Sequence, residues 1–350
     1  MVNFRDLHFD APNKEDSPAP SGGNDTLADD LKFSGPAPVT ENPSGSPADS
    51  AENRPNLHEQ ASLYLHAVFA EVREKKPFSI PDGYRLMHQM VESRPSQDTL
   101  FIMAFHQNSS HNYVINHSVN VAIFAMTMGA HLGFGKEEQI EIGMAGLLHD
   151  VGTALIPDSI INKKDKLSDK EFKIIQERPK HSYRLIKACG ERYHHLAEIA
   201  MQVYEKVDGS GYPHRLKGDE IHEFAQILGL VDMYEALTHD RPQREKLSFF
   251  SAVKEIIQSS KNAFQRKHLK MLLSIFSIFP IYSYVRLNSD AIGKVVETFP
   301  DQPMRPRLQI IYDSQKRRVL TERIINLPEN PLLYIVDSVS EQELEALAGI

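Results

Sequence analysis

The chain has 350 residues, of which 41% are hydrophobic, and its formal net charge is −8. This length and composition predict a soluble globular protein with one large domain or two smaller ones. An acidic chain lacks the basic footprint that nucleic acid or an anionic membrane surface requires, so we expect neither as a partner. Cys189 is the single cysteine, which excludes an intramolecular disulfide and suits a reducing cytoplasm.

The N-terminal residues contain no basic region followed by an apolar run, so we expect no secretory signal and a cytoplasmic location. The longest apolar run lies between Lys270 and Arg286 and is interrupted by serines and by Pro280. It is shorter than the roughly 20 residues that a membrane-spanning helix needs. The sequence therefore predicts no membrane insertion.

Residues 1–55 are rich in Pro, Ser, Gly, Asn and Asp and contain few aliphatic side chains. Such a composition cannot offset the entropy of ordering, and it predicts a disordered, acidic tail. Two short apolar and acidic pieces occur at residues 4–9 and 27–33. They are either docking motifs for a protein partner or parts of a solvated tail.

Helical periodicity begins near Leu57 and predicts a helical lead-in over residues 56–105 and a helical domain over residues 106–265. Ser168 and Glu171 have the spacing of a capping box at the start of one helix. In the loop at residues 208–213, two glycines and a proline cannot continue a helix. The helices are expected from about 57, 81 and 97, around 117–128, and over 136–149, 169–178, 192–206, 224–238 and 248–264.

The pattern changes after Tyr282 to short β-like runs separated by Asp, Gly and Pro. These runs predict a small antiparallel β appendix within residues 266–350, after a basic patch at residues 266–270. The fold class is therefore mainly α with a C-terminal β appendix. Strands are expected at residues 284–287, 293–296, 308–312, 318–320 and 333–336.

One apolar helix ends in the adjacent pair His149 and Asp150, next to Gly152. Neighbouring side chains on a helix point about 100° apart, so such a pair can bind one cation only near a helix end. His117 shares an apolar stripe with core residues, and Asp232 lies on another apolar stripe. Histidine and carboxylate positions on three apolar helices are typical of a site for Fe, Mn, Zn or Mg. The alternative is that they are polar groups of the core and that function resides in the tail or the appendix.

Five motifs in the same order resemble the HD-GYP family of metal-dependent phosphohydrolases. They lie at residues 117–122, 147–152, 156–158, 208–213 and 232–242, so the resemblance covers about residues 100–260. It implies an HD-type helical bundle that hydrolyses cyclic di-GMP with two or more metal ions and a metal-bound hydroxide. It also implies two ligand sets. His117, His149, Asp150 and Asp232 would bind the first cation, and Asp150 would bridge to a second cation bound by three histidines.

The chain departs from this pattern at the second ligand set. Arg178, Val203 and Tyr204 occupy the three histidine positions, and Thr153 stands where the family has lysine. Valine has no donor atom, arginine stays protonated in proteins, and a phenol is a poor ligand at neutral pH. We therefore expect at most one divalent ion in a degenerate active site whose catalytic residue is Asp150. His181, about one turn after Arg178, is either a substitute ligand or a surface residue.

A guanidinium at Arg178 can bind phosphate bidentately, or it can simply point to solvent. Gly211, Tyr212 and Pro213 form either a ligand-binding loop or a structural turn. We expect a signalling protein that binds a cyclic dinucleotide, another phosphate ester or a protein partner, with impaired phosphodiesterase activity. The alternative is an active one-metal phosphohydrolase.

Overall fold

The computed structural model describes residues 56–92, 104, 113–241, 246–259, 262–275, 279, 281–299, 302 and 304–348. The expected disordered tail lies outside these residues, as does all but Ala104 of the helix expected from Gln97.

Two helices open the described part of the chain, as the periodicity predicts. They are α1 (Leu57–Arg73) and α2 (Ile80–Glu92). The side chain of Asn56 accepts the backbone N–H of Glu59, and the carboxylate of Glu59 accepts the N–H of Asn56. This capping box satisfies two donors that the first turn leaves free, and it fixes where α1 begins.

The centre of the helical part is built from α4 (Tyr113–His131), α5 (Lys136–Leu148) and α10 (Glu223–Thr238). Helix α4 contacts α1, α5, α10 and α12 (Arg266–Ile275), and its side chains are buried around most of its circumference. A helix that is apolar on all sides needs such neighbours on all sides. His117 and Asn120 on α4 and Glu235 on α10 are therefore buried.

The chain turns sharply after α5. His149 is the C-terminal cap of α5, and a 3₁₀ turn, Val151–Leu155, follows Asp150. A Cβ atom at Gly152 would lie 2.4 Å from the carbonyl oxygen of Arg178 and 2.5 Å from the backbone nitrogen of Ser182. Only glycine permits this close approach between the turn and the next long helix.

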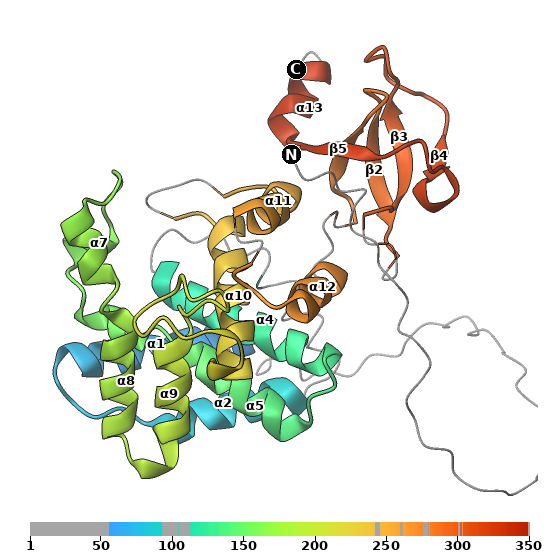
Figure 1. The fold of residues 1–350 in the computed structure, drawn as a ribbon. Coiled ribbons are helices and arrows are strands. Elements are labelled where there is room, and N and C mark those ends of the chain that lie inside the picture. The colour runs from blue at the N-terminus through green and yellow to red at the C-terminus, as the bar shows by residue number, and fades with distance from the viewer. Residues whose placement is uncertain are drawn as a thin grey trace, which may run out of the picture. The chain divides into compact units, whose positions relative to one another are not determined.

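That next long helix is α8 (Arg178–Ala188), which follows α6 (Asp158–Ile161) and α7 (Asp169–Ile175). The predicted capping box at the start of α7 is confirmed. Pro179 stands in the first turn of α8, where a missing N–H has no consequence, so it begins the helix and does not kink it. Figure 1 shows α8 beside α9 (His194–Gln202), a helix shorter than expected at both ends.

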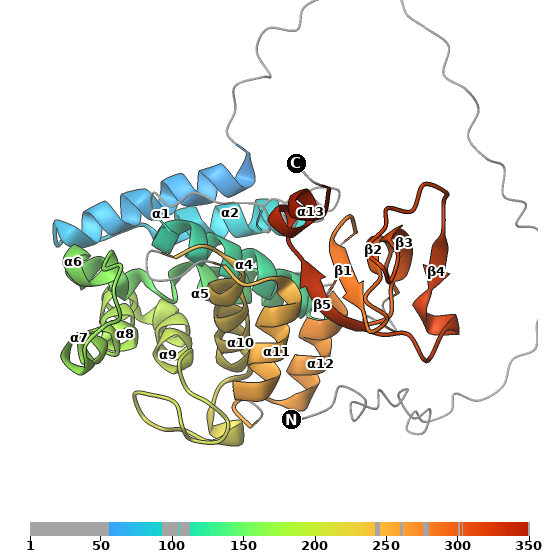
Figure 2. The same ribbon diagram turned by 90° about the horizontal axis from the view of Figure 1, so that it is seen from above.

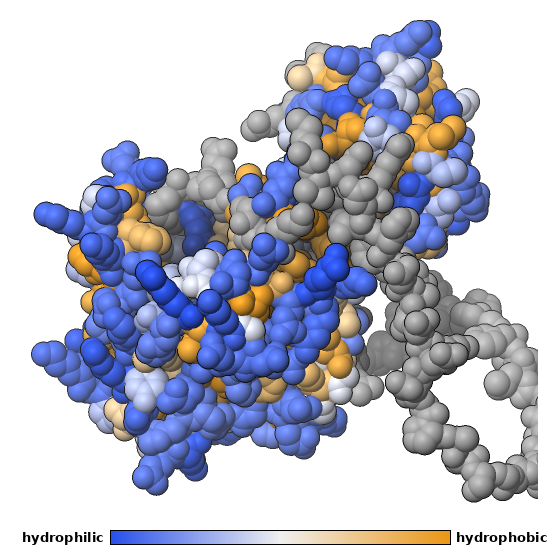
Figure 3. All heavy atoms as spheres, in the orientation of Figure 1, coloured by the Kyte–Doolittle hydropathy of each residue, from blue (hydrophilic) through white to orange (hydrophobic). Residues whose placement is uncertain are grey.

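Two further helices pack on α10: α11 (Phe249–Ser259) and α12, and Figure 2 shows the three side by side. The sequence did not predict α12, because its basic residues were interpreted as a patch. The visible surface of the helical part is mainly hydrophilic (Figure 3). No helix in the described ranges has the length and hydropathy that a membrane crossing requires.

The C-terminal part contains an antiparallel sheet with strand order β4-β3-β2-β1-β5. The fold class predicted from the sequence is confirmed, but the strand expected at residues 318–320 is wrong. Arg318 forms only an isolated bridge to Tyr312, and β4 lies further along the chain. Helix α13 (Glu341–Ala348) was not expected. The strands are β1 (Tyr284–Leu287), β2 (Ile292–Glu297), β3 (Arg307–Tyr312), β4 (Ile324–Asn326) and β5 (Ile335–Val339).

Substitution of Gly152 with Ala should destabilise the protein by about 1–3 kcal/mol, because the added methyl group meets backbone atoms of α8 that cannot rotate away. Urea unfolding measures this free energy. Gly135→Ala is a matched control, since a Cβ there meets nothing closer than 3.7 Å. Equal stability of Gly152→Ala and the wild type would contradict the close packing described.

Candidate metal centre

The three helices at the centre of the fold bring two histidines onto one carboxylate oxygen. Asp232 Oδ1 on α10 lies 2.9 Å from His117 Nε2 on α4 and 3.2 Å from His149 Nε2 at the end of α5. Adjacent donors around an ion with bonds of about 2.1 Å are about 3.0–3.4 Å apart in octahedral or tetrahedral geometry. Both distances to Asp232 Oδ1 therefore match the spacing of neighbouring ligands around one cation.

Asp150 reaches the same two histidines from the 3₁₀ turn. Ligand atoms of His117, His149 and Asp150 lie within 4.8 Å of one another, and the three residues are buried. Asp232 contacts both histidines but does not belong to this mutually close group.

Hydrogen bonds to the other ring nitrogens orient both histidines. His149 Nδ1 donates to the carbonyl oxygen of Gly146 at 2.7 Å, and His117 Nδ1 donates to Glu235 Oε2. Each Nε2 is thereby directed at Asp232, which is the arrangement that partners of metal-binding histidines commonly enforce. The sequence analysis missed Glu235, although it stands three residues after Asp232 and such residues share a helix face.

The electrostatics of the site reflect its buried carboxylates. Burial alone would lower the pKa of His117, but the charge of Glu235 and hydrogen bonds to Asp232 and Glu235 raise it to about 9. Burial would raise the pKa of Asp232, but hydrogen bonds from His117 and His149 hold it well below its usual value. The site therefore concentrates negative charge that a cation, or a proton on His117, must balance.

Arg178 and Tyr204 also contact Asp150. Arg178 Nη1 donates to Asp150 Oδ2 at 2.9 Å, and the hydroxyl of Tyr204 lies 3.3 Å from Asp150 Oδ1. The guanidinium carbon lies 4.8 Å from the centroid of the Tyr204 ring. Burial raises the pKa of Tyr204 well above its usual value, so the phenol stays protonated and acts as a donor to Asp150. The solvent-facing alternative for Arg178 is wrong, because its side chain is only 18% exposed.

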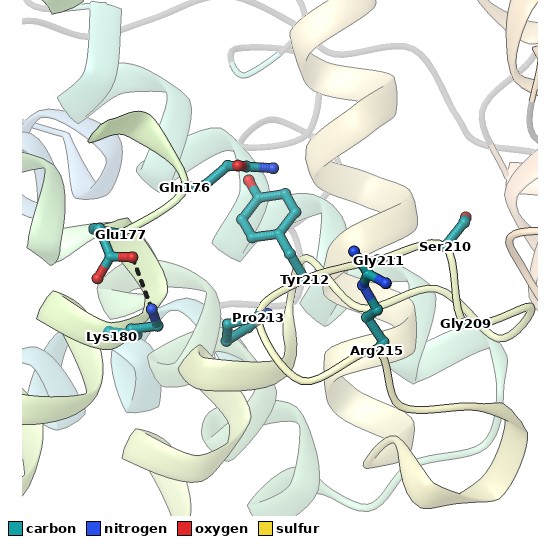
Figure 4. Close-up of a pocket in the computed structure, with 9 residues that line it drawn as sticks. All are labelled: Gln176, Glu177, Lys180, Gly209, Ser210, Gly211, Tyr212, Pro213 and Arg215. Atoms are coloured by element: carbon teal, nitrogen blue, oxygen red, sulfur yellow. Dashed lines mark hydrogen bonds and ion pairs between the residues drawn. The ribbon is translucent and has the colours of Figure 1, made fainter. Parts of the chain in front are cut away.

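Figure 4 shows the residues that line a cleft of about 500 Å³. Tyr212 lines the cleft, and its ring stacks on Tyr204 with centroids 5.3 Å apart and planes 4° apart. The aromatic pair connects the cleft with Arg178. Gly211 and Pro213 also line it, together with Gln176, Glu177, Lys180, Gly209, Ser210 and Arg215.

The loop that carries Tyr212 is fixed by Glu205. Its carboxylate accepts the backbone N–H groups of His214, Arg215 and Leu216 at 2.6–3.1 Å. Gly211 packs on the same residue, since a Cβ there would lie 2.4 Å from the Cα of Glu205. The loop is thus both a rigid structural turn and a wall of the cleft, and the two interpretations of residues 211–213 are compatible.

Among the described residues, Val203 and His181 do not belong to the close group of potential metal ligands. Val203 is buried, and His181 stands on α8 with its Cβ near Gly152. The structure therefore brings together the four residues assigned to the first cation. Arg178 and Tyr204 both contact one of them, the carboxylate of Asp150.

Comparison with known families agrees with this arrangement. Residues 103–267 match the family described as an HD domain. Residues 284–347, which contain the sheet, match the KOW domain associated with HD domains. The chain is an HD-domain protein of the HD-GYP type.

Relatives of this HD-GYP protein include cyclic dinucleotide phosphodiesterases. It is 24% identical over 295 residues to the cyclic di-GMP phosphodiesterase PA4108 of Pseudomonas aeruginosa, covering 83% of this chain and 71% of that protein. It is 29% identical over 207 residues to the cyclic di-GMP phosphodiesterase PdeB of Borreliella burgdorferi, covering 59% of this chain and 54% of PdeB. This chain therefore spans about half the length of the second relative.

One solved structure has a similar fold. Bd1817 of Bdellovibrio bacteriovorus, described as an HDG"Y"P protein, superposes with a TM-score of 0.53 over 65% of this chain and 74% of Bd1817. The two chains are 14% identical, so the likeness concerns the fold alone.

Without a metal ion, the protein should lose stability between pH 6.5 and about 9. The folded-state pKa of His117 is raised above the ordinary histidine value of 6.5 to about 9, so the stabilisation by its charge is complete below pH 6.5 and lost as pH rises through 9. Thermal unfolding in a chelator across this range measures the slope. His117→Gln should flatten it, and an unchanged slope in this variant would contradict the assignment.

Proposed function

We propose that this protein is a degenerate HD-GYP protein of cyclic dinucleotide signalling that binds one divalent ion and a phosphate ester ligand, with impaired phosphodiesterase activity. The observation that carries the proposal is that Asp150 lies close to two histidines and is also paired with an arginine. Ligand atoms of His117 and His149 lie within 4.8 Å of a ligand atom of Asp150, and Arg178 binds the same carboxylate at 2.9 Å.

The first cation position retains a suitable donor set. Two imidazole nitrogens and two carboxylates suit Fe, Mn or Zn. Such an ion, when bound, supplies Lewis-acid polarisation of the phosphoryl group. His117, His149, Asp150 and Asp232 would hold it, and Glu235 would orient His117 through Nδ1.

The second cation position is the one that the resemblance assigns to histidines at 178, 203 and 204. Arg178 brings a permanent positive charge to Asp150 there, so Asp150 cannot also bridge to a second ion without losing this ion pair. Two metals stabilise both the attacking and the leaving oxygen of an in-line displacement. A guanidinium replaces the charge of the second metal but cannot generate a nucleophile, which favours binding over hydrolysis.

The ligand class follows from the relatives and from the cleft. The two relatives compared above are cyclic di-GMP phosphodiesterases, and the cleft offers a tyrosine ring for stacking beside the cationic side chains of Lys180 and Arg215. Bases stack on aromatic rings, and guanidinium groups bind phosphate. Lys180 is paired with Glu177 at 2.7 Å, so Arg215 is the stronger candidate for a phosphate contact.

An active one-metal phosphohydrolase is the second candidate. It is favoured by the burial of His117, His149 and Asp150, which keeps the first donor set assembled. In this case Arg178 would stabilise developing negative charge on the phosphate in place of a second metal.

The two candidates differ in turnover. We expect one divalent ion per chain by elemental analysis, binding of cyclic di-GMP by calorimetry, and little or no hydrolysis. Asp150→Ala should release the ion. Hydrolysis that disappears in Asp150→Ala would favour the active enzyme, and absence of any bound ion would contradict both candidates.

Restoration of the missing histidines provides a gain-of-function test. The triple variant Arg178→His, Val203→His and Tyr204→His should bind a second ion and hydrolyse cyclic di-GMP faster than the wild type, because it removes the competing guanidinium and adds three donors. Arg178→Gln is the control that removes the charge without adding a ligand. A correctly folded triple variant that still binds one ion would contradict the account of the second position.

A further inference from the structure

A chain of buried hydrogen bonds leads from the candidate metal centre to helix α1. Glu235 Oε1 accepts from Asn120 Nδ2 at 3.0 Å, and Asn120 Oδ1 lies 3.0 Å from His58 Nε2. Glu235 Oε2 binds His117 Nδ1. All four side chains are at most 5% exposed, so water cannot replace any of these bonds without opening the helical packing.

The chemistry fixes the direction of each bond. The carboxylate of Glu235 only accepts, and its low pKa of about 2 keeps it ionised. Asn120 must therefore turn its NH₂ group to Glu235 and its oxygen to His58. His58 must then donate through Nε2, and burial lowers its pKa, so it does so as the neutral ring.

His58 lies outside the region that matches the HD domain, which begins at residue 103. It stands in the first turn of α1, whose start is fixed by the capping box of Asn56 and Glu59. A buried polar side chain needs a hydrogen-bond partner. The partner of His58 is Asn120, which is connected through Glu235 to His117. The lead-in helix is thus connected to the site by hydrogen bonds as well as by apolar packing.

We propose that His58 and Asn120 are positioning residues of the metal centre. They hold the carboxylate of Glu235 in the orientation that presents His117 Nε2 to the cation, and the docking of α1 is thereby coupled to metal affinity. This inference rests on the proposed metal centre. It adds that the ion-binding unit includes a helix outside the HD domain.

Four variants test the proposal. His58→Leu removes the donor and replaces the ring with an apolar side chain of similar size. His58→Gln places an amide N–H near the position of Nε2 and should preserve the hydrogen bond to Asn120. Asn120→Ala breaks the chain one step nearer the metal. His66→Leu is the matched control, because His66 is an exposed histidine of the same helix.

Metal dissociation constants, measured by competition with a chromophoric chelator, give the first readout. Loss of an outer partner of a ligand typically weakens metal binding about 10–100-fold, and we expect about tenfold for Asn120→Ala and about threefold for His58→Leu. His58→Gln and His66→Leu should resemble the wild type. In the Asn120→Ala background, His58→Leu should have no further effect, because the chain is already broken.

Hydrogen exchange gives the second readout. Coupling between two sites is reciprocal, so metal binding should slow amide exchange in the first turns of α1 in the wild type and less in His58→Leu. A wild type that binds metal with the same affinity as His58→Leu and Asn120→Ala would overturn this inference alone. A wild type that binds no metal would overturn the proposed function and this inference together.

Discussion

The burial of three carboxylates within one small region is the constraint on which the site depends. Asp150 and Glu235 are almost fully buried and Asp232 is partly buried, with its side chain 16% exposed, so each charge must be compensated locally. Arg178 compensates Asp150, and Glu235 and Asp232 share His117. A divalent ion would complete this balance. The positions of α4, α5, α8 and α10 are the ones that bring these charges and their partners together.

The backbone around the site serves this arrangement. Glycine at position 152 lets the 3₁₀ turn approach α8 closely, and Pro179 starts α8 directly after the arginine that reaches Asp150. Glu205 fixes the loop that carries Tyr212 against Tyr204. Arg178 and Tyr204 contact Asp150 and stand at two of the positions where the resemblance expects histidines, and Tyr212 stacks on Tyr204. The replacements at positions 178 and 204 therefore form one packed unit, whereas Val203 is simply buried.

The sequence predicted much of the fold, because apolar periodicity and motif order are local signals, and the structure brings the four residues proposed for the first cation close together. The mainly helical class, the capping box at Ser168 and four of the five strands were found in this way. The partners of Asp150 and His117 were harder to predict. Glu235 had a weak signal in its spacing from Asp232. His58 had none, since its contact with Asn120 spans 62 positions and depends on how α1 packs on α4.

Anomalous diffraction from crystals grown with Mn or Fe tests the central claim most directly, because it locates each ion and counts the ions per chain. The account predicts one ion bound by His117, His149, Asp150 and Asp232, with the bond between Arg178 and Asp150 retained. Two ions bridged by Asp150, with Arg178 displaced, would contradict it.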